Sequence, residues 1–254
     1  LFLPNAYDIP NKNGVDTLKA GTRICGIRAG VLVGDGQTYA LNKRQGYSSI
    51  STDVLATGRC PAYFIKWSEV DFLRAEGALR GWNMGGTAQE FYERGIRNAY
   101  LEDPLIGAPQ YTEFVDAYMA QEVPVDYIQV DPLRDGPDWP SVTKIGVKWN
   151  EADDNETKLE KIITQKYIAL FPLSTEAWTE LRRTGYPKLF PVLNTDDGDG
   201  SIEQGEMIRR IPWVPTDPIA AAMVENSGIP ALGGPDEQAT RLWWDVDAPN
   251  FDFE

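Results

Sequence analysis

The chain has 254 residues, of which 42% are hydrophobic and 24% charged, a composition typical of a folded domain rather than of a disordered or membrane-spanning chain. Its 38 acidic residues outnumber its 24 basic residues, and the net charge of −14 opposes binding to nucleic acid and to anionic membrane surfaces. Histidine is absent, which excludes Ser-His-Asp and Cys-His catalysis and every His-ligated metal site.

Residues 1–62 are rich in Gly, Asn, Ser and Thr and keep no helical period, so we expect loops with a few short strands there. The chain starts without the basic and apolar stretches of a targeting segment, and we expect this start to be internal. Two options stay open for Cys25 and Cys60, one disulfide in an exported protein or two buried free thiols.

Two consecutive helices are predicted at residues 67–80 and 87–101. The first is apolar nearly all round except for one face with Glu69, Glu76 and Arg80, so it is expected to be mostly buried. Glycines break the chain after it, and Thr87 to Glu90 has the pattern of a capping box that opens the second helix. Small residues on both helices allow close approach, which predicts an antiparallel hairpin of tetratricopeptide size.

Three further helices follow in the sequence. A short one is expected from residue 112 to about 121, and a proline-rich connection then covers 124–150. Asp153 and Glu156 resemble a capping box before the apolar stripe of a helix that ends before Pro172. Ser174 is expected to cap the next helix, which the RRTGYP run at 182–187 should end with basic residues, Gly185 and a proline.

Residues 188–254 read as loop with short extended pieces and one brief helix that opens at Asp217-Pro218. The predicted fold class is therefore mainly α, with tetratricopeptide-like helical hairpins, long irregular loops and a few short strands. We expect one compact unit over 1–254, made of a loop-rich segment 1–62, a helical core 63–187 and a loop-rich C-terminal segment 188–254.

An acidic segment at 195–206 nearly fits the twelve-residue calcium loop. Asp197, Asp199 and Glu206 occupy its third, fifth and twelfth positions, but Thr195 stands where the pattern has Asp, and the flanks offer no good helices. Two interpretations stay open, an acidic surface turn without a metal or a loop that holds one structural calcium ion.

Aromatic residues are the natural candidates for sugar contacts, because sugars present flat faces of C–H groups that stack on aromatic rings. The candidates in loops and at helix ends are Tyr39, Tyr47, Trp82, Trp139 and Trp149. The alternative for each of them is core packing or the anchoring of a loop.

Three blocks of sequence resemble one family. The first is SEVDFLRAEGA at 68–78 followed by AQEFYERGI at 88–96. The second joins ITQKYIALF at 163–171, EAW at 176–178 and the RRTGYP run. The third comprises IRRIPW at 208–213, EN at 225–226 and WWD at 243–245. In this order they resemble the SusD-like (SusD/RagB) starch-binding lipoproteins.

The resemblance implies a non-enzymatic subunit, lipid-anchored at the cell surface on the outer membrane, which hands a bound oligosaccharide to a SusC-like TonB-dependent transporter. The family's usual chain is about twice this long, so this chain would be its C-terminal part, and the lipid anchor is expected on the N-terminal part. The signature residues are expected to be scaffold, with Arg182 and Arg183 pairing or stacking with neighbours and Trp178 within cation–π reach of Arg182.

Other functions stay open beside glycan capture. Some relatives bind peptides, and the helical hairpin alone would suit a helical-repeat scaffold for protein interaction. A glycoside hydrolase is the weakest alternative, because among 38 carboxylates close acid pairs occur by chance. Separately, the sequence contains neither a phosphate loop nor a dinucleotide fingerprint. We expect no cofactor apart from the calcium ion considered above.

Overall fold

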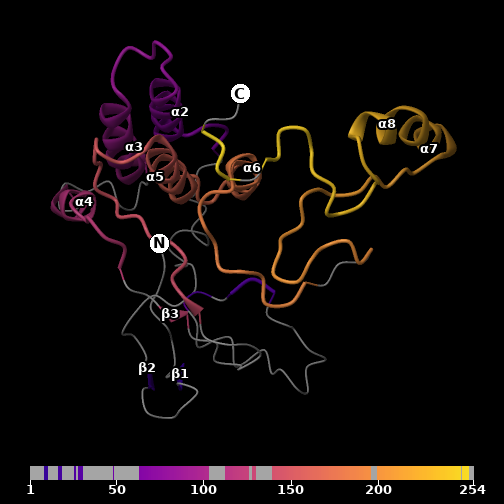
Figure 1. Ribbon diagram of the computed structural model, residues 1–254, viewed down its shortest axis with the longest axis horizontal. Helices are drawn as coiled ribbons and strands as arrows, with labels where there is room; N and C mark the ends of the chain where they lie inside the picture. The colour runs from indigo at the N-terminus through magenta and orange to yellow at the C-terminus, as the bar shows by residue number, and fades with distance from the viewer. Residues whose placement is uncertain are drawn as a thin grey trace. The chain divides into compact units, whose positions relative to one another are not determined.

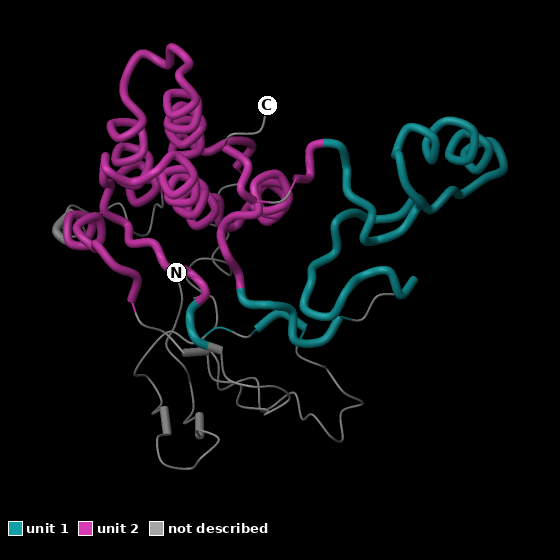
Figure 2. Tube along the Cα trace, viewed as in Figure 1, with its two compact units in different colours: residues 1–61, 126–141, 190–243 teal, residues 62–125, 142–189, 244–254 magenta. Residues whose placement is uncertain are grey.

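The computed structural model describes residues 9–10, 17–18, 26, 28–30, 48, 63–102, 112–125, 128–129, 139–195, 199–246 and 248–251. Contacts group the chain into two compact units, shown in different colours in Figure 2. Unit 1 comprises 1–61, 126–141 and 190–243, and unit 2 comprises 62–125, 142–189 and 244–254. The unit boundaries near 62 and 189 lie within two residues of the predicted segment boundaries. One compact unit for the whole chain stays a prediction, and each unit is described by itself below.

Unit 2 holds the long helices of the protein (Figure 1). They are α2 (Trp67–Leu79), α3 (Ala88–Glu102), α4 (Thr112–Met119), α5 (Asn155–Ala169) and α6 (Ser174–Thr184). The five helices predicted between residues 67 and 184 are thereby confirmed. Their order and the loops between them give the mainly helical, hairpin-based fold class that the sequence predicts.

Helices α2 and α3 form the predicted antiparallel hairpin. Ser68, at the start of α2, is hydrogen-bonded to Glu102 at the end of α3, and Asp71, one turn later in α2, bonds to Arg94, earlier in α3. Gly95 lets the helices approach closely, because a Cβ atom there would lie 2.9 Å from the Phe72 ring. The close approach is the physical reason for a small residue at this position.

The predicted capping box of α3 is present. The Thr87 backbone N–H donates to the Glu90 carboxylate at 2.8 Å, and the Glu90 N–H donates to the Thr87 hydroxyl at 3.2 Å. Two backbone donors at the helix start are therefore satisfied reciprocally. The hydrogen bonds at the carboxylate lower the pKa of Glu90 from its ordinary value.

Two predicted helix caps are wrong by one residue. Asp154 caps α5 by accepting from the Thr157 N–H at 2.6 Å, whereas Asp153 accepts from Lys161. Glu156 does not reach back to the helix start, because its carboxylate is used by the Tyr186 hydroxyl, 2.5 Å away. A buried partner thus takes the side chain that the local pattern assigned to a capping box.

The second wrong cap is at α6, which includes Ser174 as its first residue rather than using it as a cap. Leu173 occupies the capping position without a side-chain hydrogen bond, and its N–H donates to the Leu170 carbonyl at 2.6 Å. This tight turn brings the chain into the helix one residue early. The predicted stop is confirmed, since Gly185 adopts a left-handed conformation with φ 73° at the end of α6.

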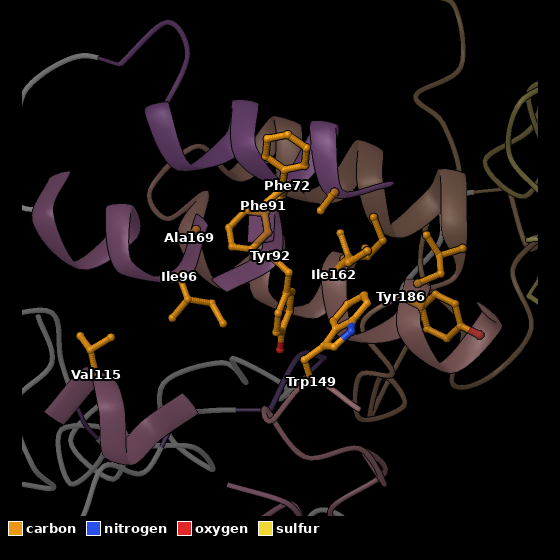
Figure 3. Packing of buried hydrophobic residues seen from close by; sticks show 12 residues of the cluster. Phe72, Phe91, Tyr92, Ile96, Val115, Trp149, Ile162, Ala169 and Tyr186 are labelled. Atoms are coloured by element: carbon orange, nitrogen blue, oxygen red, sulfur yellow. The ribbon is translucent and has the colours of Figure 1, made fainter. Parts of the chain in front are cut away.

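The core of unit 2 lies between the hairpin and α5 (Figure 3). Phe72 of α2 and Tyr92 of α3 meet edge to face with centroids 6.4 Å apart, a favourable arrangement of two rings. The buried apolar residues are Phe72, Ala75, Phe91, Tyr92, Ile96, Val115, Trp149, Leu159, Ile162, Ile163, Ala169 and Tyr186. The helical periods of the sequence therefore set which faces meet in the core.

Unit 1 has short elements in the residues that are described. Strands β1 (Ile9–Pro10) and β2 (Thr17–Leu18) pair antiparallel, as do β3 (Ile128–Gln129) and β4 (Trp139–Pro140). The predicted brief helix is confirmed as α7 (Pro218–Met223), which Asp217 caps. It continues through η3 (Val224–Gly228), a π-helical turn, into α8 (Ile229–Leu232).

Candidate functional site

The structure describes the side chains of two of the five aromatic residues predicted to contact sugar. Tyr39 and Tyr47 lie outside the described residues, as do Cys25 and Cys60. Trp139 belongs to strand β4, but its side chain is outside the described part. Of the predicted residues, only Trp82 and Trp149 therefore have a described side-chain setting.

Trp149 lies in the core of unit 2 rather than in an open loop. Its side chain is 7% exposed, and its ring lies 5.1 Å from that of Tyr92, centroid to centroid (Figure 3). The indole N–H donates to the Glu151 carboxylate at 2.9 Å. Trp149 therefore packs in the core, which is the alternative given for every candidate. The proline-rich connection contributes this one large ring to the core.

Trp82 lies on the surface, in the turn between α2 and α3, and its side chain is 63% exposed. Its backbone N–H donates to the Gly77 carbonyl at 2.9 Å, which fixes the turn. A Cβ atom on Gly77 would lie 3.3 Å from the indole and 2.9 Å from the sulfur of Met84. The ring therefore rests against the end of α2 and leaves the rest of its surface open.

Another exposed aromatic residue, Trp213 in unit 1, is one of the signature residues that the sequence analysis predicts to be scaffold. The guanidinium of buried Arg210 lies 4.5 Å from the centre of its ring, within cation–π distance. Asp236 pairs with Arg210 and also accepts from the Trp213 backbone N–H at 3.3 Å. A Cβ atom on Gly228 would lie 3.3 Å from the indole, so the η3 backbone packs directly against the ring.

These contacts hold the Trp213 ring in place while 39% of the residue stays exposed. A ring that is already ordered loses little conformational entropy when a ligand stacks on it. The available sequence signal is local, an arginine three residues before a tryptophan, but the partners Asp236 and Gly228 lie too far along the chain to be found from a pattern.

The candidate calcium loop is described only in part. Asp197 lies outside the described residues. Asp199 accepts from the backbone N–H groups of Ser201 at 3.0 Å and Gln238 at 2.9 Å. A hydrogen bond with the Ser201 side chain, followed by these backbone hydrogen bonds, lowers the pKa of Asp199. Glu206 is exposed and lies 3.7 Å from Arg209. Within the described ranges, acidic and cysteine side chains form no group of three or more that could hold a metal ion. The calcium site stays a prediction.

A charged network occupies the buried side of α2, where the sequence places a polar face. Glu76 bonds to Arg80 at 3.0 Å, as predicted, and to Arg183 of α6 at 2.6 Å. Arg183 also pairs with Glu180, and Glu180 in turn pairs with Lys166 of α5 at 3.0 Å. The network thus ties α2, α5 and α6 together.

The network keeps the Glu76 carboxylate charged. Burial alone would raise the pKa of Glu76, but the hydrogen bonds and charge of Arg183, helped by Arg80, hold this pKa below its ordinary value. A general acid in a glycoside hydrolase needs the opposite shift, a raised pKa. The Glu76 cluster therefore has the properties of a structural ion-pair network.

The predicted stacking of Arg182 is also confirmed. Its guanidinium lies 3.5 Å from the ring centre of Trp178 and 4.8 Å from that of Trp244. Trp178 precedes it by one helical turn, and Trp244 comes from the C-terminal WWD block. These signature residues therefore contact one another inside unit 2, as expected of scaffold.

Comparison with known proteins shows which family has this arrangement. A family model described as SusD-like, "Susd and RagB outer membrane lipoprotein", matches residues 8–245. No curated protein matches the chain. None of the helices in the described part of the chain is both long and apolar enough to cross a membrane.

Solved structures agree with the family model. A chitin-binding SusD homolog from Flavobacterium johnsoniae is 36% identical, with a TM-score of 0.71 over 96% of this chain and 46% of that one. A SusD homolog from Bacteroides uniformis is 34% identical, with a TM-score of 0.71 over 95% of this chain and 46% of that one. A SusD homolog from Bacteroides ovatus is 42% identical, with a TM-score of 0.59 over 70% of this chain and 36% of that one.

The chain therefore spans less than half the length of these relatives. The family model covers nearly all of its residues, and the three sequence blocks fall within the matched range. The chain belongs to the SusD-like family.

Proposed function

We propose that this chain is the C-terminal part of a non-enzymatic subunit that captures glycan at the cell surface for a SusC-like TonB-dependent transporter. The observation that carries the proposal is the 36% identity with a chitin-binding SusD homolog over 96% of the chain. The lipid anchor of the full-length protein would lie on its N-terminal part, outside these residues. A chitin-type oligosaccharide is the first ligand to test.

Trp213 is our leading candidate for a sugar contact, and Trp82 is the second. Each side chain is exposed, and the Trp213 ring is held by Arg210 and Gly228. Stacking of a sugar ring on a fixed indole gives moderate affinity and easy release, which suits capture for transport. We expect dissociation constants of about 1 μM to 1 mM, equivalent to roughly −8 to −4 kcal/mol.

Two features of the side chains support a non-enzymatic role. Its sequence has no histidine to act as a general base. The buried carboxylates of Glu76 and Asp71 are paired with Arg183 and Arg94. The arginine partners of Glu76 hold its pKa below the ordinary value, so Glu76 is a poor proton donor at neutral pH and suits binding without hydrolysis.

A scaffold for protein interaction is the second candidate, and a peptide-binding relative of the same family is a variant of the first. The scaffold is favoured by one observation, a group of exposed apolar side chains at the start of α2 that includes Trp67 and Leu73. Such a group marks an interaction surface on a folded protein. The two roles are compatible, because a subunit that serves a transporter must also contact protein.

Calorimetry on the full-length protein tests the proposal. Chitin oligosaccharides should bind with the affinity given above, and maltooligosaccharides and peptides of similar length should bind more weakly. Trp213→Ala should weaken binding at least tenfold, which corresponds to a loss of about 1.4 kcal/mol or more. Trp213→Phe, which keeps an aromatic face, should stay within about threefold.

Two outcomes would contradict this proposal. Equal binding by wild type and Trp213→Ala would remove Trp213 from the site without removing the glycan ligand. Release of reducing sugar by the full-length protein at about 1 per second or faster, abolished by replacing one carboxylate, would show an enzyme instead of a binding subunit.

A further inference from the structure

A helical arm of unit 1 lies against the Trp213 ring. Helix α7, the π-helical turn η3 and helix α8 run without a break from 218 to 232, and we call them the arm (Figure 1). None of these three elements has a buried residue. Burial in a core therefore does not account for the residues that the arm carries.

The widened turn of the arm has a local cause in the sequence. Pro230 has no backbone N–H, so it cannot donate to the carbonyl four residues earlier, and its ring would clash with that carbonyl in a regular helix. Just before it the turn is wider, and the Ile229 N–H donates to the Val224 carbonyl five residues back. A π-helical turn is what a proline at this position favours.

Gly228, the last residue of η3, has no such local cause. Its φ of −66° and ψ of −56° are right-handed helical values that are open to other residues as well. Pro230 restricts the residue directly before it, which is Ile229 and not Gly228. Glycine within a helix is less favourable than alanine, because it loses more conformational freedom on folding. The backbone alone would therefore favour alanine at this position.

The close approach of the arm to Trp213 gives the reason for glycine. A Cβ atom on Gly228 would lie 3.3 Å from Cη2, 3.4 Å from Cζ2 and 3.5 Å from Cζ3 of the indole. These three atoms form the outer edge of the six-membered ring. The shortest distance is below the optimum for two carbon atoms, so a side chain at this position would push the ring away.

The other contacts of Trp213 decide where a displaced ring would go. The guanidinium of buried Arg210 lies 4.5 Å from the ring centre, and Asp236 pairs with Arg210 and accepts from the Trp213 N–H at 3.3 Å. On these sides the ring meets fixed groups, while 39% of the residue is exposed. A ring pushed by a side chain at 228 therefore moves towards solvent, where it is less firmly held.

From these contacts we propose that Gly228 is a positioning residue of the Trp213 sugar site. Its lack of a side chain fixes the indole against the arm, and it does so at the expense of helix stability. The proposal rests on the proposed function, because it takes Trp213 as the stacking residue. A ring held in one orientation loses less conformational entropy on binding than a mobile one. Gly228 thus acts on the ligand through Trp213.

Gly228→Ala separates this role from a purely structural one, because the two roles predict opposite changes in stability. In the full-length protein, chitin oligosaccharides should bind the variant about threefold to tenfold more weakly by calorimetry, the loss expected when a side chain has to be ordered on binding. The midpoint of thermal unfolding should equal that of wild type or rise, because alanine is the better helix former. A structural role would lower this midpoint.

Two alanine variants serve as matched controls. Ser227→Ala changes the neighbouring exposed position of η3 and also favours the helix. Gly26→Ala adds a Cβ atom at a glycine of unit 1 where no heavy atom lies within 4 Å. Both controls should bind chitin oligosaccharides within about twofold of wild type, as surface substitutions usually do.

A measurement without glycan reports on the ring itself. In protein labelled with fluorotryptophan, the fluorine resonance of Trp213 is assigned by its absence from Trp213→Phe. This resonance should shift or broaden in Gly228→Ala and stay in place in Ser227→Ala.

The outcomes distinguish this proposal from the proposed function. If Trp213→Ala lost binding while Gly228→Ala kept it, or if the Trp213 resonance were unchanged in Gly228→Ala, the role of Gly228 would be overturned and the sugar site would stand. Equal binding by Trp213→Ala and wild type would overturn both. A lowered unfolding midpoint with unchanged affinity would show that Gly228 is structural.

Discussion

The described residues of the two units are held by different kinds of contact. In unit 2, helices bury an apolar cluster around Phe72 and Tyr92. In the described part of unit 1, the two buried residues are both arginines, Arg28 and Arg210. Arg28 donates from Nε to the Pro191 carbonyl at 2.7 Å, and Arg210 pairs with Asp236. The described part of unit 1 thus shows polar contacts between distant residues, whereas unit 2 buries an apolar cluster.

This difference has a structural consequence that can be seen at Gly30. In unit 1 the Leu193 N–H donates to the Ala29 carbonyl at 2.9 Å, so two distant loops lie side by side. Gly30 has a φ of +78°, and a Cβ atom on it would lie 2.6 Å from the Asn194 carbonyl oxygen. Glycine is required here on both grounds, because backbone approaches backbone without side chains between them. Such contacts give precise positions with little hydrophobic stabilisation.

The largest effect should follow from removing a ring of the unit 2 core. We expect Phe72→Ala to lower the free energy of unfolding by about 3–5 kcal/mol, because it leaves a cavity between α2 and α3. Phe114→Ala, at an exposed position of α4, should change it by less than about 1 kcal/mol. Chemical denaturation of the full-length protein measures both, and equal losses would show that the core is not where the structure places it.

Features that depend on local sequence are predicted better than contacts between distant residues. Helical periods and the stop signal at Gly185 are local, and the structure confirms them. The predicted capping box is wrong because Asp154 caps α5 in place of Asp153 and because Glu156 bonds to a distant partner, Tyr186. The prolines around Trp149 predict that it lies in a loop, yet its ring contacts Tyr92, which is 57 positions earlier in the sequence. Contacts between distant residues carry no local pattern, and they are what assembles the core and the surroundings of Trp213.

A smaller and more local effect is expected in unit 1. Arg210→Met removes the ion pair with Asp236 and the cation–π contact with Trp213, and it leaves a partly buried carboxylate without its cation. We expect a loss of about 2–4 kcal/mol, seen by hydrogen exchange as faster opening of 208–240. The α2–α3 hairpin should keep its protection.

The matched control for this variant is the neighbouring residue. Arg209→Met removes a contact of 3.7 Å with an exposed carboxylate, and ion pairs with an exposed partner contribute little, so its effect should stay below about 1 kcal/mol. If Arg209→Met opened the segment as much as Arg210→Met, the buried pair would not be what holds this region. If Arg210→Met also loosened α2, the contrast between apolar and polar stabilisation would fail.

The smallest expected effect depends on pH and concerns the charged network that joins α2, α5 and α6. Arg183 and Arg80 hold the pKa of Glu76 below its ordinary value of 4.5, against the effect of burial. A carboxylate with a lowered folded-state pKa contributes stability that is fully present above the unfolded-state pKa, and this contribution is lost as pH falls through the folded-state pKa. Glu76→Gln should therefore cost about 1–2 kcal/mol at pH 7, since it removes one charge and leaves Arg183 paired with Glu180. The difference between wild type and variant should stay constant between pH 8 and about 6 and shrink below pH 4.5, because protonation removes the same charge from the wild type.

Glu176→Gln, at an exposed position in the first turn of α6, serves as the control and should alter stability by only a few tenths of a kcal/mol at either pH. A difference between wild type and Glu76→Gln that grew on acidification would mean that the carboxylate is held protonated by burial, and the network would then stabilise unit 2 by packing instead of by charge.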